Sequence, residues 1–459
     1  MPDNLVLSFD SFLQEQLKGR KVLLLGFGRE GRSSWDYLRR LPHPVHLGIA
    51  DRACSREELP VDAEVHTGEA YLQQAGQFDL CLCSPGIPRH IVRALPETME
   101  VTSQTDLFLR HFHSRSLGIT GTKGKSTTST LVSMMLRKSG IPALLAGNIG
   151  IPPFEAVLQG TEQSLFVLEL SAHQLAGIRR APHIACLLNL FEEHLDHFHD
   201  LEEYFQSKWR IALLQGTGDH LVIPGGDTAM ERLRSEFPPP SVVHHFSGPL
   251  FRGRTNVDLT SVLLEDRDIT LEMDLRHAPA FPGLHQRRNA VAAAMMAALA
   301  GARQEGIQQA VEEFHGLPHR LEYLGEWKGL HYYNDAIATI PEAVMEAIRS
   351  LGRVDTLILG GMDRGISYDG LAAFLGDVVP GLVLGSGPAG KRIIGLLRDK
   401  GYPGEVQWFA RFGEAVDAAR EGTAAGGTIL LSPAAPSYDE FRDFTEKGKF
   451  FKKKAEGLI

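Results

Sequence analysis

Cysteine is scarce in this chain of 459 residues: there are four, with no CxxC pair and no zinc-type spacing. So few cysteines in a chain of this length predict reduced thiols and exclude a disulfide framework. Residues 1–19 contain no basic segment followed by an apolar one, and no run reaches about 18 uninterrupted apolar residues. We therefore expect a cytoplasmic protein without an export signal and without membrane insertion.

A basic block is also missing. Lysine and arginine number 47 against 56 aspartate and glutamate residues, which gives a formal charge of −9. A protein that coats nucleic acid needs clustered positive charge to neutralise phosphates, so we expect no nucleic-acid partner. Hydrophobic residues at 43% and charged residues at 22% are close to the globular average, and the length corresponds to about three domains.

Short apolar runs followed by glycine turns and helical stretches recur along the chain. Residues 21–26 form the first such run, a second unit begins near residue 113, and the pattern restarts near residue 355. Apolar strands that alternate with helices predict α/β domains with parallel sheets. We place three domains at residues 1–112, 113–318 and 319–459.

A glycine turn between a predicted strand and a predicted helix has the sequence Thr-Gly-Thr-Lys-Gly-Lys-Ser-Thr at residues 120–127. Glycines allow backbone N–H groups to surround a phosphate, and the helix N-terminus adds its positive end. Lys125 has the place of the lysine that meets the β- and γ-phosphates, and Ser126 or Thr127 that of a Mg²⁺ ligand. The pattern is a shortened P-loop, because Ile119 replaces the first glycine of the motif. The alternative is an ordinary glycine turn with an exposed lysine.

A second glycine turn has the spacing of a dinucleotide-binding fingerprint. Gly26, Gly28 and Gly31 are followed by Asp51 at the end of the next predicted strand, about twenty residues on. Alone, this pattern indicates a nicotinamide-dependent oxidoreductase. The same turn binds any nucleotide diphosphate, so a chain that also has a P-loop need not be a redox enzyme.

Acidic and histidine side chains follow two predicted strands after the P-loop. Glu169 and Ser171 end one strand, and Glu193, His194 and Asp196 follow another. Open α/β sheets bind ligands at these carboxyl ends. Mg²⁺ held by the glutamate, a hydroxyl and phosphate suits these segments better than a transition metal, because the histidine spacing is loose and cysteine is absent.

Other polar residues have less specific interpretations. His197 and His199 are interpreted as polar loop residues. By composition alone Lys208 is a surface lysine. A solvated helix end is the interpretation of the lysines near the C-terminus, which are Lys447, Lys449, Lys452, Lys453 and Lys454.

Taken together, these residues resemble the Mur ligases, the ATP-dependent amino-acid-adding enzymes of peptidoglycan precursor synthesis, and most closely the MurD type, which adds glutamate to UDP-N-acetylmuramoyl-L-alanine. The resemblance covers essentially the whole chain. Its motifs occur in a fixed order: GTKGKST at 121–127, GNIG at 147–150, ELS at 169–171, EHLD at 193–196, SK at 207–208, GLH at 283–285 with NA at 289–290, GLPHR at 316–320, ND at 334–335, GG at 360–361, LSP at 431–433 and SYDEF at 437–441.

The resemblance implies a Rossmann-like N-terminal domain for the UDP end of the substrate, a central P-loop ATPase domain, and a C-terminal α/β domain that closes over ATP and glutamate. It implies that ATP, with Mg²⁺, converts the substrate carboxylate into an acyl phosphate, which the amino group of glutamate attacks. Lys208 matches the family lysine that CO₂ converts into a carbamate. The implied catalytic residues are Lys125, Lys208, His194 and Glu169, and the implied metal ligands are Ser126, Glu169, His194 and carbamylated Lys208.

The resemblance also assigns the residues that contact the three substrates. It implies ATP contacts for Gly121, Thr122, Lys123, Gly124, Lys125, Ser126, Thr127, Asn289, Arg320 and Asp335. It implies contacts with the UDP-substrate for Gly26, Gly28, Gly31, Asp51, Ser84, Gly86, Asn148 and Ser171. It implies contacts with glutamate for Arg364, Ser437 and Phe444.

Two motifs in the third predicted domain depart from the MurD pattern. Ile337 replaces the lysine that follows Asn-Asp-Ser in enzymes that add D-glutamate, and Gly-Gly-Asp-x-Lys becomes Gly361-Met362-Asp363-Arg364. The stretch is more similar to the subgroup that adds L-glutamate, whose product a partner epimerase then converts. The sequence therefore favours L-glutamate, with the D-glutamate reaction as the alternative. A nicotinamide oxidoreductase and a non-catalytic protein with a dead ATPase fold are remote, because neither requires the P-loop lysine, Lys208 and the acidic ligands together.

Overall fold

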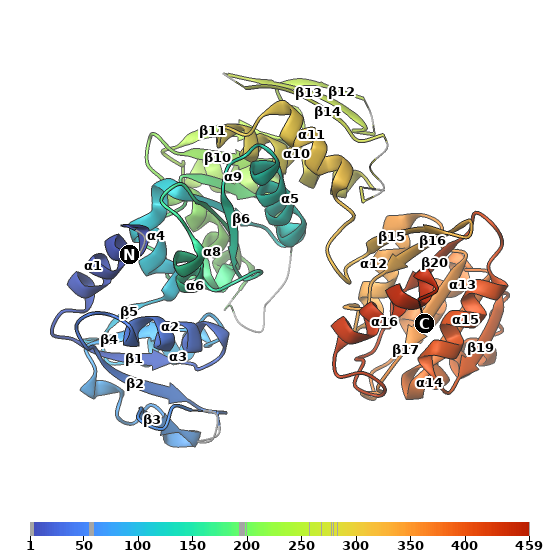
Figure 1. The fold of residues 1–459 in the computed structure, drawn as a ribbon, viewed down its shortest axis with the longest axis horizontal. Helices are drawn as coiled ribbons and strands as arrows, with labels where there is room; N and C mark the ends of the chain where they lie inside the picture. The colour runs from blue at the N-terminus through green and yellow to red at the C-terminus, as the bar shows by residue number, and fades with distance from the viewer. Residues whose placement is uncertain are drawn as a thin grey trace. The chain divides into compact units, whose positions relative to one another are not determined.

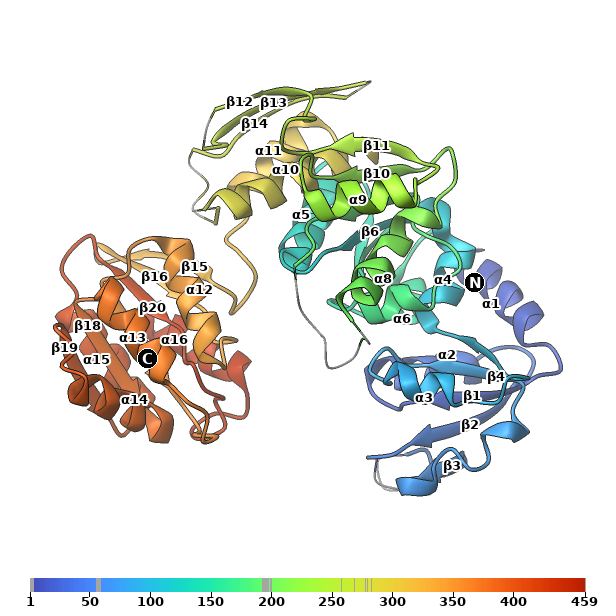
Figure 2. The ribbon, with the colours of Figure 1, turned by 180° about the vertical axis from the view of Figure 1, so that it is seen from behind.

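The computed structural model describes residues 4–54, 59–191, 198, 200–256, 258–267, 269–276, 278, 280, 281 and 283–458 (Figures 1 and 2). The chain separates into two compact units, Met1–Arg276 with Arg287–Glu312, and His277–Gln286 with Glu313–Ile459. Strands alternate with helices in both units, so the predicted α/β class with parallel sheets is confirmed. The boundaries near residues 112 and 318 stay a prediction.

The first sheet of the first unit has parallel strands in the order β3-β2-β1-β4-β5. Its central strand is apolar and buried from Val22 to Leu25, as expected where helices cover both faces of a sheet. The elements of this part are α1 (Asn4–Leu17), β1 (Lys21–Leu25), α2 (Arg29–Arg39), β2 (His46–Asp51), β3 (Glu64–Thr67), β4 (Leu80–Cys83), α3 (Arg89–Arg93), β5 (Glu100–Thr102) and α4 (Gln104–Phe112).

The central sheet of the first unit is also parallel, in the order β11-β10-β9-β6-β8-β7. β8 and β7 lie on one side of β6 and β9 lies on the other, so the carboxyl end of β6 is a switch point where open α/β sheets bind ligands. Its elements are β6 (Ser116–Thr120), α5 (Lys125–Lys138), β7 (Ala143–Gly147), α6 (Pro153–Gln159), β8 (Leu165–Glu169), α7 (Ala172–Ala176), β9 (Ile184–Leu187), α8 (Leu201–Leu213), β10 (His220–Ile223), α9 (Thr228–Glu236) and β11 (Val242–His245).

A small antiparallel sheet follows β11, in the order β12-β13-β14, with β12 (Gly253–Thr255), β13 (Ser261–Asp266) and β14 (Ile269–Asp274). The helices α10 (Leu284–Leu299) and α11 (Gln304–Glu313) come next. Gln308 of α11 donates a hydrogen bond to the carbonyl of Asp274 and accepts one from its N–H, each 3.1 Å long. This contact fixes α11 against the end of β14.

The second unit contains a sheet in the order β15-β16-β20-β17-β18-β19, in which β15 is antiparallel to β16 and the other neighbours are parallel. Its elements are β15 (Glu322–Trp327), β16 (Leu330–Asn334), α12 (Pro341–Leu351), β17 (Thr356–Gly360), α13 (Asp369–Val378), β18 (Leu382–Ser386), α14 (Gly387–Asp399), β19 (Glu405–Phe409), α15 (Phe412–Gly422), β20 (Thr428–Leu431) and α16 (Phe444–Glu456).

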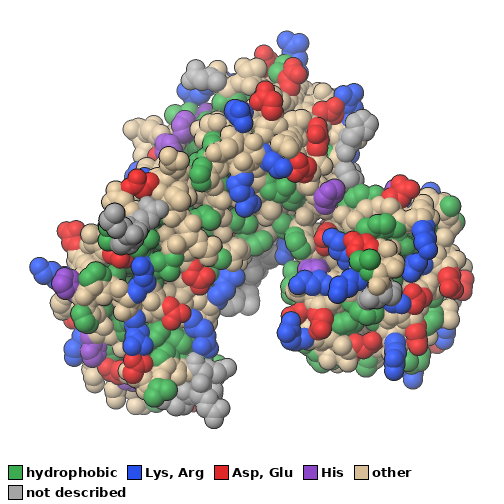
Figure 3. Space-filling view, viewed as in Figure 1, with side chains coloured by type: hydrophobic (Ala, Val, Ile, Leu, Met, Phe, Trp, Pro, Cys, Tyr) green, Lys and Arg blue, Asp and Glu red, His purple; other side chains and the backbone are tan. Residues whose placement is uncertain are grey.

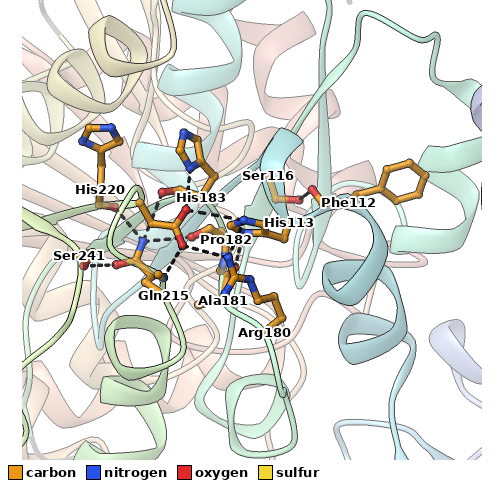
Figure 4. Close-up of polar contacts among 12 residues, drawn as sticks. Phe112, His113, Ser116, Arg180, Ala181, Pro182, His183, Gln215, His220 and Ser241 are labelled. Carbon is orange, nitrogen blue, oxygen red and sulfur yellow. Dashed lines mark hydrogen bonds and ion pairs between the residues drawn. The ribbon is translucent and has the colours of Figure 1, made fainter.

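The polar cluster in Figure 4 lies at the amino ends of central strands, since His183 directly precedes β9 and His220 begins β10, whereas the P-loop follows the carboxyl end of β6. His183 shares a hydrogen bond of 2.7 Å with Asp219, and Gln215 donates to three backbone carbonyls. Arg180 donates to Nε2 of His113 at 2.7 Å, while Nδ1 of this histidine lies 3.1 Å from the carbonyl of Ala181. His113 is therefore held as a neutral ring whose proton is on Nδ1.

Acidic and basic side chains are interspersed on the faces of both units that Figure 3 presents. In the part of the chain that the structure describes, no helix is both long and apolar enough to cross a membrane. The four cysteines are all free thiols.

Candidate nucleotide and substrate site

The P-loop joins β6 to α5, and two of its glycines have backbone conformations that other residues rarely adopt. The φ angles are +150° at Gly121 and +87° at Gly124. A Cβ atom on Gly124 would lie 2.6 Å from Nδ2 of Asn289, a buried side chain of α10. Glycine therefore allows α10 to bring Asn289 against the loop, and these two predicted ATP residues are in contact.

Asn189, which follows β9, holds the P-loop from the neighbouring strand. Its Nδ2 donates to the carbonyl of Lys123 at 3.0 Å, and its Oδ1 accepts from the N–H of the same residue at 2.8 Å. The hydroxyl of Thr122 accepts from the N–H of Phe191 at 3.0 Å. No role was predicted for Asn189 from the sequence. Its position directly after a buried strand was the available signal.

Two lysine ammonium groups meet at one carbonyl oxygen of the P-loop. Nζ of Lys125 donates to the carbonyls of Gly121 and Thr122 at 2.9 and 3.0 Å. Nζ of Lys208 donates to the same Gly121 carbonyl at 2.9 Å and lies 4.9 Å from the centre of the Tyr204 ring. Lys208 is only 2% exposed, so its interpretation as a surface lysine is wrong. Its side chain lies at the P-loop.

Glu169 ends β8, in register with Ile119 of β6. The carboxylate is buried. One oxygen accepts a hydrogen bond of 2.6 Å from Nδ2 of Asn148, and the other has no hydrogen-bond partner among the described residues. A buried carboxylate oxygen of this kind is a suitable ligand for a hard cation. The predicted metal ligand and one predicted UDP-substrate contact are thus directly joined.

The remaining predicted metal ligand after β9, His194, and its neighbours are not placed. His194, Glu193, Asp196, His197 and His199 lie outside the residues that the structure describes. Within the described ranges, no group of three or more histidine, cysteine, aspartate or glutamate side chains could hold a metal ion.

The first glycine turn follows β1, and its predicted residues hold one another in place. Asp51 accepts hydrogen bonds from the N–H groups of Phe27, Ala53 and Cys54, so its carboxylate orders both loops. The hydroxyl of Ser84 donates to the carbonyl of Gly26 at 2.8 Å. A Cβ atom on Gly31 would lie only 2.2 Å from that carbonyl oxygen, which explains the third glycine of the motif.

An open hollow of about 540 Å³ lies at this turn. A Cβ atom on Gly28 would meet no atom of the described residues within 4 Å, so this glycine faces open space. Gly86 is exposed, and a Cβ atom there would likewise meet no described atom within 4 Å. The hollow carries two positive charges and one carboxylate, and its lining consists of Phe27, Gly28, Arg29, Arg32, Asp51, Ala53 and Cys54.

Asp335 and Arg320 lie together in the second unit. The Asp335 carboxylate accepts from the hydroxyl of Ser432 at 2.9 Å and from the N–H of Leu321 at 3.0 Å. Burial raises the pKa of Asp335 to about 7, against the lowering effect of the Ser432 hydrogen bond and of the Arg320 charge. Ser432, which directly follows β20, thus supports one of the predicted ATP residues.

The predicted glutamate residues lie on adjoining segments of the second unit. The N–H of Met362 donates to the carbonyl of Pro436 at 2.8 Å, next to Ser437, and Arg364 donates to the carbonyl of Thr339 at 2.9 Å. The Ser437 hydroxyl is buried and, among the described residues, has no hydrogen-bond partner. The segments that contain Ile337, Arg364 and Ser437 therefore meet at one end of the sheet.

Phe444, the remaining predicted glutamate residue, begins α16, and its ring lies 6.1 Å from that of His319. Lys447, one turn on, is 1% exposed. Its Nζ donates to the carbonyl of Gly360 at 2.7 Å and lies 4.8 Å from the centre of the Phe412 ring. Burial lowers the pKa of Lys447 to about 8, although Asp439 and Glu440 counteract this. The interpretation of Lys447 as part of a solvated helix end is wrong.

The chain is similar to known proteins over most of its length. The profile of the Mur ligase middle domain matches residues 119–297. The chain is 35% identical to the UDP-N-acetylmuramoylalanine–D-glutamate ligase of Symbiobacterium thermophilum, over 89% of this chain and 90% of that protein. It is 34% identical to the UDP-N-acetylmuramoyl-L-alanine–L-glutamate ligase of Salinispora tropica, over 95% and 97% of the two chains. The crystal structure of UDP-N-acetylmuramate–alanine ligase from Thermotoga maritima has the same fold, with a TM-score of 0.55, 16% identity and 96% and 100% coverage.

The chain belongs to the Mur ligase family, since relatives at least 30% identical cover most of its length. Within that family, the relatives from Symbiobacterium thermophilum and Salinispora tropica are named as glutamate ligases. The resemblance drawn from the ordered motifs is therefore confirmed.

Proposed function

We propose that this protein is an ADP-forming ligase that uses ATP to add glutamate to UDP-N-acetylmuramoyl-L-alanine in peptidoglycan precursor synthesis. The meeting of Lys125 and Lys208 on the Gly121 carbonyl carries this proposal. An ordinary glycine turn needs no second, buried lysine. The first glycine turn, with its hollow and two arginines, is assigned to the UDP end of the substrate and not to a nicotinamide.

Amide formation requires an activated carboxylate, because a carboxylate is a poor electrophile. Transfer of the γ-phosphoryl group gives an acyl phosphate, which the glutamate amino group attacks. Bringing a carboxylate to the γ-phosphate costs about 4 kcal/mol per pair of unit charges at 4 Å and an effective dielectric near 20. Lys125 supplies positive charge at this place, and the backbone N–H groups of the P-loop hold the phosphates.

The residues present fit Mg²⁺. Glu169 offers a buried oxygen with no hydrogen-bond partner among the described residues, and Ser126 lies in the first turn of α5. These two residues would hold one Mg²⁺ ion, and His194 would hold a second. When bound, Mg²⁺ supplies positive charge to the transferring phosphoryl group.

Lys208 is proposed to form a carbamate: its ammonium group first loses a proton to solvent, and the neutral amine then forms an N–C bond to CO₂ with release of a second proton. The support is electrostatic: its Nζ and that of Lys125 each lie 2.9 Å from one oxygen atom. Conversion of one ammonium group into an anion replaces repulsion between them by attraction, and it provides an oxygen ligand beside the phosphate site.

L-glutamate is the proposed amino acid, with D-glutamate as the alternative. The relatives named for the two enantiomers are 34% and 35% identical, so the choice depends on the site residues. The segments of Ile337 and Arg364 meet where Arg364 donates to the carbonyl of Thr339. Because Ile337 is uncharged, the positive charge comes from the Arg364 guanidinium, on a different wall of the glutamate pocket from the lysine of the D-glutamate pattern. Ser437 and Phe444 are proposed to contact the side-chain carboxylate.

The test is ADP release from ATP and UDP-N-acetylmuramoyl-L-alanine, with L- and D-glutamate supplied separately. We expect release with glutamate and a higher kcat/KM for the L-enantiomer. A higher kcat/KM for D-glutamate would refute L-specificity alone, whereas no release with either would refute the ligase. If L-glutamate is used, we infer that an epimerase acts on the product, and we place the reaction in the cytoplasm.

A further inference from the structure

Glu30, inside the first glycine turn, connects that turn to the central part of the first unit. Its Oε1 accepts a hydrogen bond of 2.7 Å from Nε2 of Gln174. The other end of that amide, Oε1, accepts from the N–H of Ser171 at 3.0 Å and from its hydroxyl at 3.2 Å. Three side chains therefore form a chain from the glycine turn to the segment that follows Glu169.

The preceding residue makes a second connection in the same direction. Arg29 donates a hydrogen bond of 3.0 Å to the carbonyl of Gly147, the residue before Asn148. Two consecutive side chains of the turn thus hold the two central segments that contain Asn148 and Ser171. Under the proposed function, on which this inference rests, the UDP-substrate contacts both segments and the turn. Binding of the UDP-substrate then depends on the hydrogen bonds of Arg29 and Glu30 that connect the turn to these segments.

The Glu30 carboxyl group is in an environment that disfavours its charge. Its Oε2 is buried and has no hydrogen-bond partner among the described residues. Burial raises the pKa of Glu30 to about 7, although the Gln174 hydrogen bond and the Arg29 charge act in the opposite direction. A neutral acid removes the unsatisfied charge and keeps Oε1 as the acceptor for Gln174.

Among the described residues, Arg29 of α2 and Gln174 of α7 act on the Glu30 carboxyl group. α4 contributes an uncharged amide, Gln104, which donates to the Glu30 carbonyl at 3.3 Å. A diphosphate in the hollow beside the turn would add negative charge, which further favours the neutral acid.

We propose that Glu30 is a positioning residue that joins the two halves of the UDP-substrate site in its protonated form, so that the enzyme takes up a proton when this substrate binds. The proton comes from solvent and is held on the carboxyl group, with no covalent change. As the pH rises above about 7, free Glu30 ionises and binding must first restore the proton. The dissociation constant should then rise by up to about tenfold per pH unit.

The experiment is calorimetric titration of UDP-N-acetylmuramoyl-L-alanine into the full-length protein without ATP, between pH 6 and 8.5. Each pH is measured in two buffers with different heats of ionisation, which gives the number of protons taken up. The phosphodiester groups and carboxylate of this ligand do not titrate in that range. We expect uptake approaching one proton at the upper end and a rising dissociation constant. In E30Q, which keeps a neutral acceptor, both effects should disappear.

Glu100→Gln is the matched control. Glu100 of β5 also bridges to the central part, since Arg179 donates to it at 2.5 Å, but its pKa is lowered, because hydrogen bonds from Arg20 and Arg179 outweigh its partial burial. This variant should keep the wild-type pH dependence and proton uptake.

Retention of the wild-type pH dependence in E30Q would overturn the role of Glu30. Binding by the wild-type protein with no proton uptake would also overturn it, without any variant, while the proposed function would stand. Failure of the wild-type protein to bind this substrate at every pH would refute the proposed function, and the role of Glu30 with it.

Discussion

Replacement of Lys208 tests the central feature of the site, the two lysines on one carbonyl oxygen. Each Nζ lies 2.9 Å from the Gly121 oxygen, so the two nitrogen atoms are at most about 5.8 Å apart. Two ammonium groups at that distance repel by about 3 kcal/mol at an effective dielectric near 20. A carbamate on Lys208 reverses the sign of this term.

The perturbation is Lys208→Ala. Loss of an attraction of about 3 kcal/mol corresponds to a fall of at least about 10²-fold in kcat. Because the missing group is an anion, acetate added to the alanine variant should restore part of the activity. Lys208→Arg keeps a positive charge that CO₂ does not convert into a carbamate, so it should be as inactive as alanine and should not respond to acetate.

Lys447→Ala is a matched control, because Lys447 is an equally buried lysine with the same kinds of contact: a glycine carbonyl at 2.7 Å and an aromatic ring at 4.8 Å. Its replacement should lower activity through the Gly360 turn, and acetate should have no effect. The assay is ADP release at saturating substrates with a titration of sodium acetate against sodium chloride. Full activity of Lys208→Arg, or equal acetate responses of the two alanine variants, would refute the carbamate.

Three further predictions follow from the geometry. Lys125→Ala should abolish ADP release, while calorimetry should still detect binding of the UDP-substrate, because the P-loop and the first glycine turn are separate sites. Near-normal turnover in this variant would refute the P-loop assignment. Gly28→Val should raise the KM for the UDP-substrate and leave the KM for ATP unchanged; a selective rise in the ATP KM would show that the two sites are exchanged. The variant should fold, since the φ of −72° suits valine and no described atom lies within 4 Å of the added Cβ, whereas the Gly31→Ala variant should not fold. Burial lowers the pKa of His113, so the folded protein resists protonation of this ring, and Tm should fall as the pH drops below about 6.5. His113→Gln keeps an acceptor for Arg180 and should make this fall smaller; a Tm profile identical to that of the wild type would contradict the prediction.

The strands predicted from continuous apolar runs are all present, because strands in the middle of a parallel sheet are buried on both faces. Those not predicted include the edge strands β3 and β19, which are half-exposed and polar at alternate positions. The antiparallel β12–β14 sheet was missed for a related reason, since its outer residues face solvent and interrupt the apolar pattern. Whether one face of a strand is buried depends on its place in the finished sheet, so it cannot be predicted from the local sequence alone.

The candidate site was predictable where its residues are adjacent in sequence. The P-loop and the first glycine turn both combine glycine with a strand and a helix, so a local pattern identifies them. The Asn189 clamp and the bond between Asn148 and Glu169 depend on which strands become neighbours. That order is decided by the whole sheet, so these contacts were not derivable from spacing.

The burial of Lys208 and Lys447 was likewise not predictable from the sequence. Both lie on amphipathic helices with polar neighbours, and composition assigns both to the surface. Both are buried, because each ammonium group finds a carbonyl at the end of a distant strand, which repays part of the cost of leaving water. Lys447 also faces Asp439 and Glu440, which favour its positive charge. The same two kinds of contact, to a glycine carbonyl and to an aromatic ring, thus hold a buried lysine in each unit.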